Sequence, residues 1–196
     1  MKILILANPR TGSTYLGQWL SNRYDIPYIH EPEFIDELTT SLNTLDNFCI
    51  KIAIPQLYYY NRDNKKLSES ECIDYFYNLI SKYKFDTILI LDRKNTNEYI
   101  ESIINLNRKS NTEDGFKEWV YDSNFKNSIT PDEWNKWSSW TMTCKNWLKS
   151  ISNKFNIPII QYEDLYYNPK SVDLGGLEFN PYLRMKLRKN SSNSII

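Results

Sequence analysis

The sequence predicts an α/β protein with a single-domain, three-layer fold, in which a parallel sheet of about five strands lies between helices. Short apolar runs alternate along the chain with longer segments of helical periodicity, the order in which right-handed crossovers join parallel strands. The run at 87–91 is apolar without interruption, as in strands that are buried on both faces of a parallel sheet. At 196 residues, the chain has the length of one domain.

Five apolar runs have the properties of strands. Each is short, contains mainly aliphatic or aromatic residues, and is bounded by polar or turn-forming residues. In chain order they are residues 3–6, 25–29, 48–54, 87–91 and 157–162. The third run contains Lys51, which is an unusual residue within a buried strand.

Segments with apolar residues at helical spacing separate these runs. Such segments begin at Leu16, span 68–83 and 99–106, and extend from Pro131 to about residue 155. Ser68 and Glu71 add a capping-box pattern to the second of them. The polar stretch at 107–130 predicts a lid or loop region, with at most a short helix around 116–121.

The charge composition argues against a nucleic-acid or membrane-surface partner. Lys and Arg together number 24, as do Asp and Glu, so no net field attracts the protein to polyanions. No apolar run approaches the roughly 20 residues of a membrane span. Any phosphate binding must therefore be local.

The cysteines and the N-terminus favour a cytoplasmic location. The three cysteines are odd in number and widely spaced, which argues against both a disulfide framework and a zinc site. The apolar run at 3–6 is shorter than the core of a signal peptide, about 7–15 residues. The abundance of Asn, Ile, Lys and Tyr suggests an AT-rich genome, such as that of a virus or phage.

Residues 7–16, Ala-Asn-Pro-Arg-Thr-Gly-Ser-Thr-Tyr-Leu, join the first strand to the first helix. A loop in this position directs backbone N–H groups and a helix N-terminus at whatever lies above the strand, which attracts phosphate or sulfate. The hydroxyls of Thr11, Ser13 and Thr14 add further donors. We therefore expect a P-loop-like phosphate-binding loop after the first strand.

The loop departs from that of nucleotide triphosphatases, Gly-x4-Gly-Lys-Ser/Thr, whose Lys reaches the terminal phosphates and whose hydroxyl holds magnesium. When Gly12 is aligned with the second glycine, Ala7 stands at the first and Ser13 stands where the Lys belongs. The cation lies ahead of the glycine, at Arg10. This difference disfavours a P-loop small-molecule kinase, which is kept as an alternative.

Residues 9–16 resemble the Pro-Arg/Lys-Ser-Gly-Ser/Thr-Thr-x-Leu loop of sulfotransferases that use 3′-phosphoadenosine 5′-phosphosulfate (PAPS). In that family the loop wraps the 5′-phosphosulfate without a metal. The resemblance implies that this group is bound by Arg10, Thr11, Gly12, Ser13 and Thr14.

A second resemblance begins at the end of the fourth predicted strand. Leu91 and Arg93, followed nine positions later by Ser102, resemble the Leu-x-Arg…Ser signature that holds the 3′-phosphate in the same family. The spacing is similar to that of bacterial sulfotransferases such as trehalose sulfotransferase. Arg suits this role because its planar fork binds a phosphate through two donors at once.

Two further segments resemble sulfotransferases. Residues 161–169 are similar to the Tyr-Glu-Asp-Leu-x-x-Asn-Pro segment after the last strand, which is mainly structural in the family. Near the C-terminus, Arg188 and Lys189 resemble the Arg-Lys-Gly that clamps the 3′-phosphate in cytosolic members, with Asn190 in place of Gly.

The residues after the second predicted strand offer candidates for a catalytic base. Glu31 is the leading one, because the Glu-Pro-x-Phe-like segment that it opens resembles the acidic base segment of bacterial and tyrosyl-protein members. His30 and Glu33 are its rivals. Lys51 is within reach of the sulfuryl group or the acceptor, or is a lysine that extends from its strand to solvent.

The resemblance implies a sulfotransferase that moves a sulfuryl group from PAPS to an acceptor hydroxyl or amine and leaves adenosine 3′,5′-bisphosphate. The acceptor is expected to be a small molecule, a carbohydrate or a peptide. The expected reaction is an in-line displacement without a metal, in which positioning and charge stabilisation supply most of the catalysis. A non-catalytic nucleotide-binding module on the same scaffold is the second alternative.

Overall fold

The computed structural model describes residues 1–31, 42–58, 67–110 and 128–181 of the chain. Five strands form one parallel sheet in the order β2-β3-β1-β4-β5. The strands are β1 (Lys2–Ala7), β2 (Tyr28–His30), β3 (Phe48–Ala53), β4 (Thr87–Asp92) and β5 (Ile159–Gln161). The predicted α/β class with its parallel sheet of five strands is confirmed.

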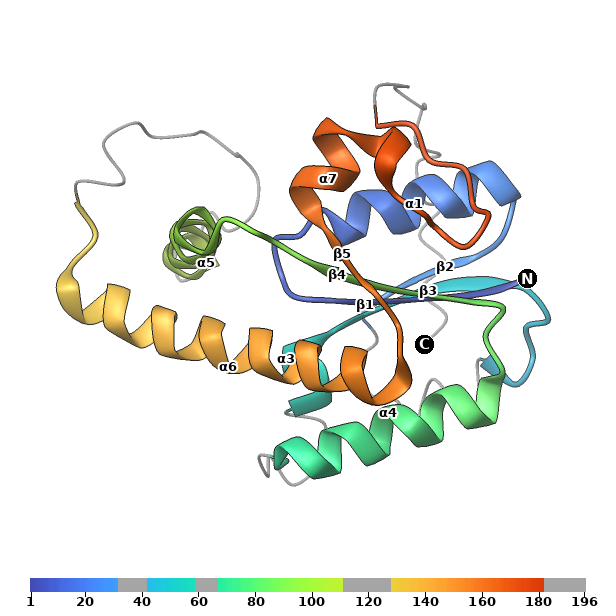
Figure 1. The fold of residues 1–196 in the computed structure, drawn as a ribbon, viewed down its shortest axis with the longest axis horizontal. Coiled ribbons are helices and arrows are strands. Elements are labelled where there is room, and N and C mark those ends of the chain that lie inside the picture. Colours follow the sequence, from blue (N-terminus) through green and yellow to red (C-terminus); the bar gives the residue numbers. More distant parts are fainter. Residues whose placement is uncertain (32–41, 59–66, 111–127, 182–196) are drawn as a thin grey trace.

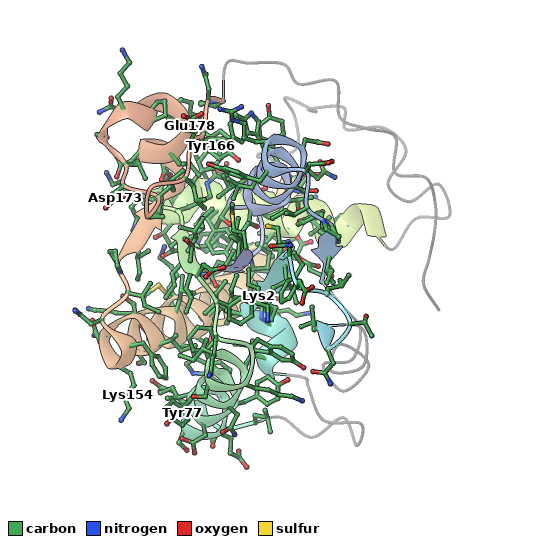
Figure 2. All side chains as sticks on the ribbon, turned by 90° about the vertical axis from the view of Figure 1, so that its right-hand side faces the viewer. Lys2, Tyr77, Lys154, Tyr166, Asp173 and Glu178 are labelled. Atoms are coloured by element: carbon green, nitrogen blue, oxygen red, sulfur yellow. The ribbon has the colours of Figure 1, made fainter. Side chains whose placement is uncertain are left out.

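Helices cover both faces of the sheet (Figure 1). They are α1 (Ser13–Tyr24), α3 (Ile54–Tyr58), α4 (Glu69–Tyr83), α5 (Thr96–Ser110), α6 (Pro131–Phe155) and α7 (Tyr162–Tyr167), followed by the 3-10 turn η2 (Pro169–Ser171). Helices α1 and α7 lie on one face, and α4 and α6 lie on the other (Figure 1). In the side view, Tyr77 and Lys154 mark the second layer, whereas Tyr166 and Glu178 mark the first (Figure 2).

The alternation of side chains along β1 produces two separate cores. Leu4 and Leu6 pack with residues of α4 and α6, such as Phe76 and Leu148. Ile3 and Ile5 point the other way and pack with Leu16 of α1 and Leu165 of α7. Because both faces of a central parallel strand are buried, its sequence is apolar throughout.

The long helices begin where the sequence supplies caps. Ser68 and Glu71 form the predicted capping box at the start of α4. At the start of α6, Thr130 and Glu133 form a second box, and Pro131 stands in the first turn. Each box satisfies backbone N–H groups that have no partner within the helix.

Several predicted boundaries were wrong. The second strand, predicted at 25–29, is Tyr28–His30, because Asp25 still caps α1. The last strand begins at Ile159 rather than at residue 157. The third strand ends at Ala53 and the last at Gln161, because Ile54 and Tyr162 begin helices α3 and α7. Helix α1 begins at Ser13, inside the predicted loop, and α5 extends to Ser110, into the stretch predicted as a lid or loop. The short helix expected around 116–121 lies outside the described residues.

Strand β1 lies at the centre of the sheet, between β3 and β4. Its last residue, Ala7, is level with Ala53 of β3 and Leu91 of β4. The chain proceeds from β1 to β2 and β3 on one side, and then crosses to β4 and β5 on the other. In open α/β sheets, ligands bind outside the carboxyl ends of the strands at such a switch point. The loop after β1 occupies this position.

Across the described ranges, no helix has both the length and the apolar character needed to span a membrane.

Candidate functional site

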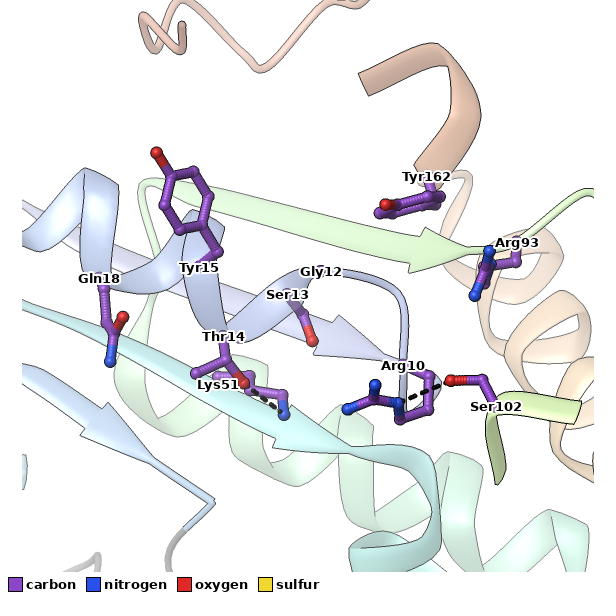
Figure 3. Close-up of a pocket in the computed structure, with 10 residues that line it drawn as sticks. All are labelled: Arg10, Gly12, Ser13, Thr14, Tyr15, Gln18, Lys51, Arg93, Ser102 and Tyr162. Carbon is purple, nitrogen blue, oxygen red and sulfur yellow. Dashed lines mark hydrogen bonds between the residues drawn. The ribbon is translucent and has the colours of Figure 1, made fainter. Parts of the chain in front are cut away.

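A cavity of about 400 Å³ opens at the carboxyl ends of β1, β3 and β4 (Figure 3). Its walls come from the loop after β1, the first turns of α1, one side chain of β3, the end of β4, and helices α5 and α7. The lining residues are Arg10, Gly12, Ser13, Thr14, Tyr15, Gln18, Lys51, Arg93, Ser102 and Tyr162. Three of them, Arg10, Lys51 and Arg93, carry positive charge, so the cavity suits an anion.

The loop requires glycine at position 12, which lies in the left-handed region with φ of 71°. A Cβ atom here would lie 2.5 Å from Cε2 of Tyr166, and the Tyr166 hydroxyl donates a hydrogen bond of 2.7 Å to the Gly12 carbonyl. Helix α7 therefore holds the loop in place by close contact.

The loop places Ser13 and Thr14 in the first turn of α1, a turn without an acidic residue. The positive end of the helix dipole therefore faces the cavity together with both hydroxyls. Thr11 is turned inward, because its side chain is fully buried and donates a hydrogen bond of 2.8 Å to the carbonyl of Asn8. Of the three predicted hydroxyls, the structure thus brings two to the cavity.

Arg10 connects the two predicted phosphate-binding segments. Its Nε donates a hydrogen bond of 2.8 Å to the hydroxyl of Ser102, which lies on α5 (Figure 3). Burial, followed by repulsion from Arg93, lowers the pKa of Arg10. Arginine nevertheless stays ionised, so its guanidinium presents a positive charge at the cavity wall.

Arg93 extends from the end of β4 into the same cavity. One guanidinium nitrogen donates to Glu98 at 3.1 Å, and the guanidinium lies over the ring of Tyr162, 4.7 Å from its centroid. Its Nε is buried and has no hydrogen-bond partner among the described residues, although it lies 3.9 Å from a carboxylate oxygen of Glu163. Arg93 is therefore held in place at the wall of the cavity.

Glu163 shapes the turn that follows Arg93. Its two carboxylate oxygens accept hydrogen bonds of 2.9 Å and 3.1 Å from the backbone N–H groups of Lys94 and Asn95. These bonds contribute to the lowered pKa of Glu163, against the opposing effect of burial. The segment that resembles a structural element of sulfotransferases thus contributes directly to the site.

On the opposite side of the cavity, Lys51 binds the predicted base. The residue is 4% exposed, and its ammonium donates to the carboxylate of Glu31 and, at 3.3 Å, to the hydroxyl of Thr14. Strands β2 and β3 bring this group together, because His30 is level with Lys51. The carboxylate of Glu31 is therefore held by a cation.

His30 completes this group, because its Nε2 lies 3.1 Å from the hydroxyl oxygen of Thr14. Burial and the ammonium of Lys51 lower the pKa of His30, against the opposing effect of Glu31, so the ring is neutral at pH 7. Since an ammonium only donates, Thr14 accepts from Lys51 and has its own proton to donate to Nε2.

Several predicted residues remain to be placed. Glu33, Arg188 and Lys189 lie outside the described residues. Conversely, Tyr15 and Tyr162 line the cavity but were not predicted. For Tyr15 the signal was its position directly after Thr14. For Tyr162 it was its position at the end of the last strand, since that edge of the sheet is where ligands bind.

No cluster of three or more His, Cys, Asp or Glu side chains within the described ranges has the arrangement of a metal site.

No family model matches the chain, and no curated protein matches it. Among solved structures, the chain is similar to the YorR protein from Bacillus subtilis, whose crystal structure was determined in complex with phosphorylated GDP. The two share 13% sequence identity, over 73% of this chain and 80% of that one, with a TM-score of 0.36. A likeness of this degree leaves the ligand and the reaction to be argued from the residues of this chain.

Proposed function

We propose that this protein binds a nucleotide carrying two anionic groups and transfers the sulfuryl group of PAPS to a hydroxyl or amine of an acceptor. The observation that supports this most directly is the contact between Arg10 and Ser102. It brings the loop that resembles the 5′-phosphosulfate site and the helix that resembles the 3′-phosphate site to one cavity.

The cavity has the size and charge that such a ligand needs. A volume of about 400 Å³ falls within the range of small-molecule sites, roughly 300–1,000 Å³. The N-terminus of α1, with Ser13 and Thr14, is suited to the 5′-phosphate. Arg93 and Ser102 are suited to the 3′-phosphate, and the ring of Tyr15 offers a flat face to the adenine.

The reaction would be a displacement at sulfur. The acceptor oxygen or nitrogen forms a bond to sulfur, the bond from sulfur to the 5′-phosphate oxygen breaks, and the acceptor gives up its proton to a base. Charge that develops on the leaving phosphate is offset by Arg10, and charge on the sulfuryl oxygens is offset by Lys51. The products are a sulfated acceptor and adenosine 3′,5′-bisphosphate.

The ion pair between Lys51 and Glu31 suggests how the base becomes available. An incoming phosphosulfate offers Lys51 a second anionic partner in the cavity. As Lys51 turns toward it, the carboxylate of Glu31 loses its cation and can accept the proton of the acceptor. His30, which is neutral, is the alternative base.

The same ion pair is also compatible with a non-catalytic nucleotide-binding module, in which Glu31 would serve only to neutralise Lys51. A transfer assay separates the two functions. The protein is incubated with PAPS labelled in the sulfuryl group and a panel of phenols, sugars, amines and tyrosine peptides. Transfer of label to one class, lost in Arg10→Gln, supports the sulfotransferase. Binding of adenosine 3′,5′-bisphosphate without transfer to any class supports the module.

A further inference from the structure

Asp92 is a buried acid that the proposed reaction does not use. It is the last residue of β4 and is 6% exposed. One carboxylate oxygen accepts a hydrogen bond of 2.9 Å from the side-chain amide of Asn8, and the other accepts one of 2.7 Å from the ammonium of Lys145 on α6. Lys145 also donates to the carbonyl of Arg93 at 2.5 Å. The ion pair between Asp92 and Lys145 therefore contacts both the start of the loop, through Asn8, and the backbone of Arg93.

Asn8 carries this arrangement into the phosphate-binding loop. It is fully buried, its backbone N–H donates to the carbonyl of Leu91 at 3.2 Å, and its own carbonyl accepts from the hydroxyl of Thr11. Its side-chain oxygen has no hydrogen-bond partner among the described residues, so the bond to Asp92 is what fixes the amide. The start of the loop is thus attached to the end of β4.

We propose that Lys145 and Asp92 are positioning residues that hold the loop and Arg93 in register for one ligand. Neither is among the residues that line the cavity. Lys145 neutralises a carboxylate that is almost out of contact with water, and this carboxylate fixes Asn8. Through its second bond, Lys145 sets the backbone from which Arg93 projects. The inference rests on the proposal that the cavity binds an anion, but not on sulfuryl transfer.

Loss of Lys145 and loss of the Asp92 charge should affect the loop differently, and this difference provides the test. Removal of Lys145 alone leaves Asp92 as a buried charge without compensation, which is strongly unfavourable. In Asp92→Asn the side-chain oxygen still accepts from Asn8, and no charge needs neutralising. The variant Asp92→Asn should therefore suppress the effect of Lys145→Met on the loop.

Hydrogen–deuterium exchange of the ligand-free protein measures this without any assumption about function. In Lys145→Met, peptides that cover residues 7–15 should exchange at least about tenfold faster, because the local opening of the loop becomes easier. Peptides from α4, on the opposite face, should not change. In the double variant, the exchange rate of the loop peptides should lie within about threefold of the rate in Asp92→Asn alone. Lys149→Met, an exposed lysine one turn further along α6, is the control.

Binding of adenosine 3′,5′-bisphosphate supplies the second measurement. Lys145→Met should weaken it at least about tenfold, and the double variant should recover most of the loss. Equal acceleration of exchange in α4 and the loop, or failure of Asp92→Asn to suppress it, would overturn the inference. If the wild type does not bind the nucleotide, the proposed function is wrong, and the exchange data alone decide the inference. If Lys145→Met does not fold, Lys145→Gln replaces it.

Discussion

The Nε of Arg10 and the hydroxyl of Ser102 are joined by a hydrogen bond of 2.8 Å, although 92 positions separate them in the sequence. The bond joins the loop after β1 to helix α5 at the wall of the cavity. The first turn of α1, with Ser13 and Thr14, and the guanidinium of Arg93 line the same cavity and offer donors for two anionic groups. This arrangement leads to predictions that separate the two halves of the site.

The first prediction concerns the 3′-phosphate. Hydrogen bonds to a charged group contribute roughly 1.5–3 kcal/mol, so Arg93→Ala should weaken adenosine 3′,5′-bisphosphate by about tenfold to a hundredfold. Affinity for AMP should scarcely change, because AMP lacks that group. Titration calorimetry of both ligands gives the ratio, and Asn105→Ala on α5 is the control. A constant ratio would mean that Arg93 does not bind the 3′-phosphate.

Gly12 gives a prediction on stability. In Gly12→Ala the new methyl group would lie 2.5 Å from the ring of Tyr166, and the residue would keep an unfavourable positive φ. We expect a loss of about 2–5 kcal/mol in unfolding free energy. Gly176→Ala separates the two causes, since Gly176 has φ of 81° and nothing within 4 Å of a Cβ atom. It should lose only about 1–2 kcal/mol in urea denaturation. Equal losses in the two variants would contradict the proposed contact with Tyr166.

A pH dependence follows from the start of α6. Hydrogen bonds from Arg108 and from the backbone of Thr130 lower the pKa of Glu133 from 4.5 to about 2. Because the folded state binds this proton less readily than the unfolded chain, Glu133 stabilises the protein above about pH 4.5, and this contribution is lost as the pH falls toward 2.

Glu133→Gln should therefore be less stable than wild type at pH 7, and the difference should shrink below about pH 4. Denaturant unfolding at several pH values measures it, with Asp132→Asn in the same helical turn as the control. A difference that is independent of pH would show that the carboxylate charge does not contribute.

The ion pair between Lys51 and Glu31 predicts opposite effects on binding and on turnover. Glu31→Gln removes the carboxylate that competes for Lys51, so PAPS should bind at least as tightly as in wild type. Loss of the base should lower turnover by about 10²-fold or more. Full turnover in Glu31→Gln together with its loss in His30→Gln would assign the base to His30.

Local patterns in the sequence predicted the fold well, because strands buried on both faces are apolar throughout and helix caps have recognisable residues. The resemblance to sulfotransferase segments singled out the loop, Arg93 and Ser102, and these residues line one cavity. The contact of Lys51 with Glu31 depends on the register of β2 against β3, which no local pattern encodes. Likewise, Lys145 meets Asp92 only because α6 crosses the sheet. Nothing in the sequence around Lys145 distinguishes it from an ordinary exposed lysine.

The boundaries that were wrong have a similar cause. Ile54 and Tyr162 continue apolar runs, so periodicity alone extends the strands through them. The chain turns into a helix at both points because it has passed the edge of the sheet. Tyr162 is thereby turned over the cavity, where it stacks on Arg93.

Titration calorimetry of the ligand-free protein tests the central claim most directly. Adenosine 3′,5′-bisphosphate, ATP and GTP are each titrated in the presence of magnesium and again in the presence of a chelator. Because Ser13 stands where a kinase loop has its lysine, we expect the bisphosphate to bind most tightly and with the same affinity in both conditions. Tight binding of ATP or GTP that requires magnesium would contradict the proposal and favour a kinase.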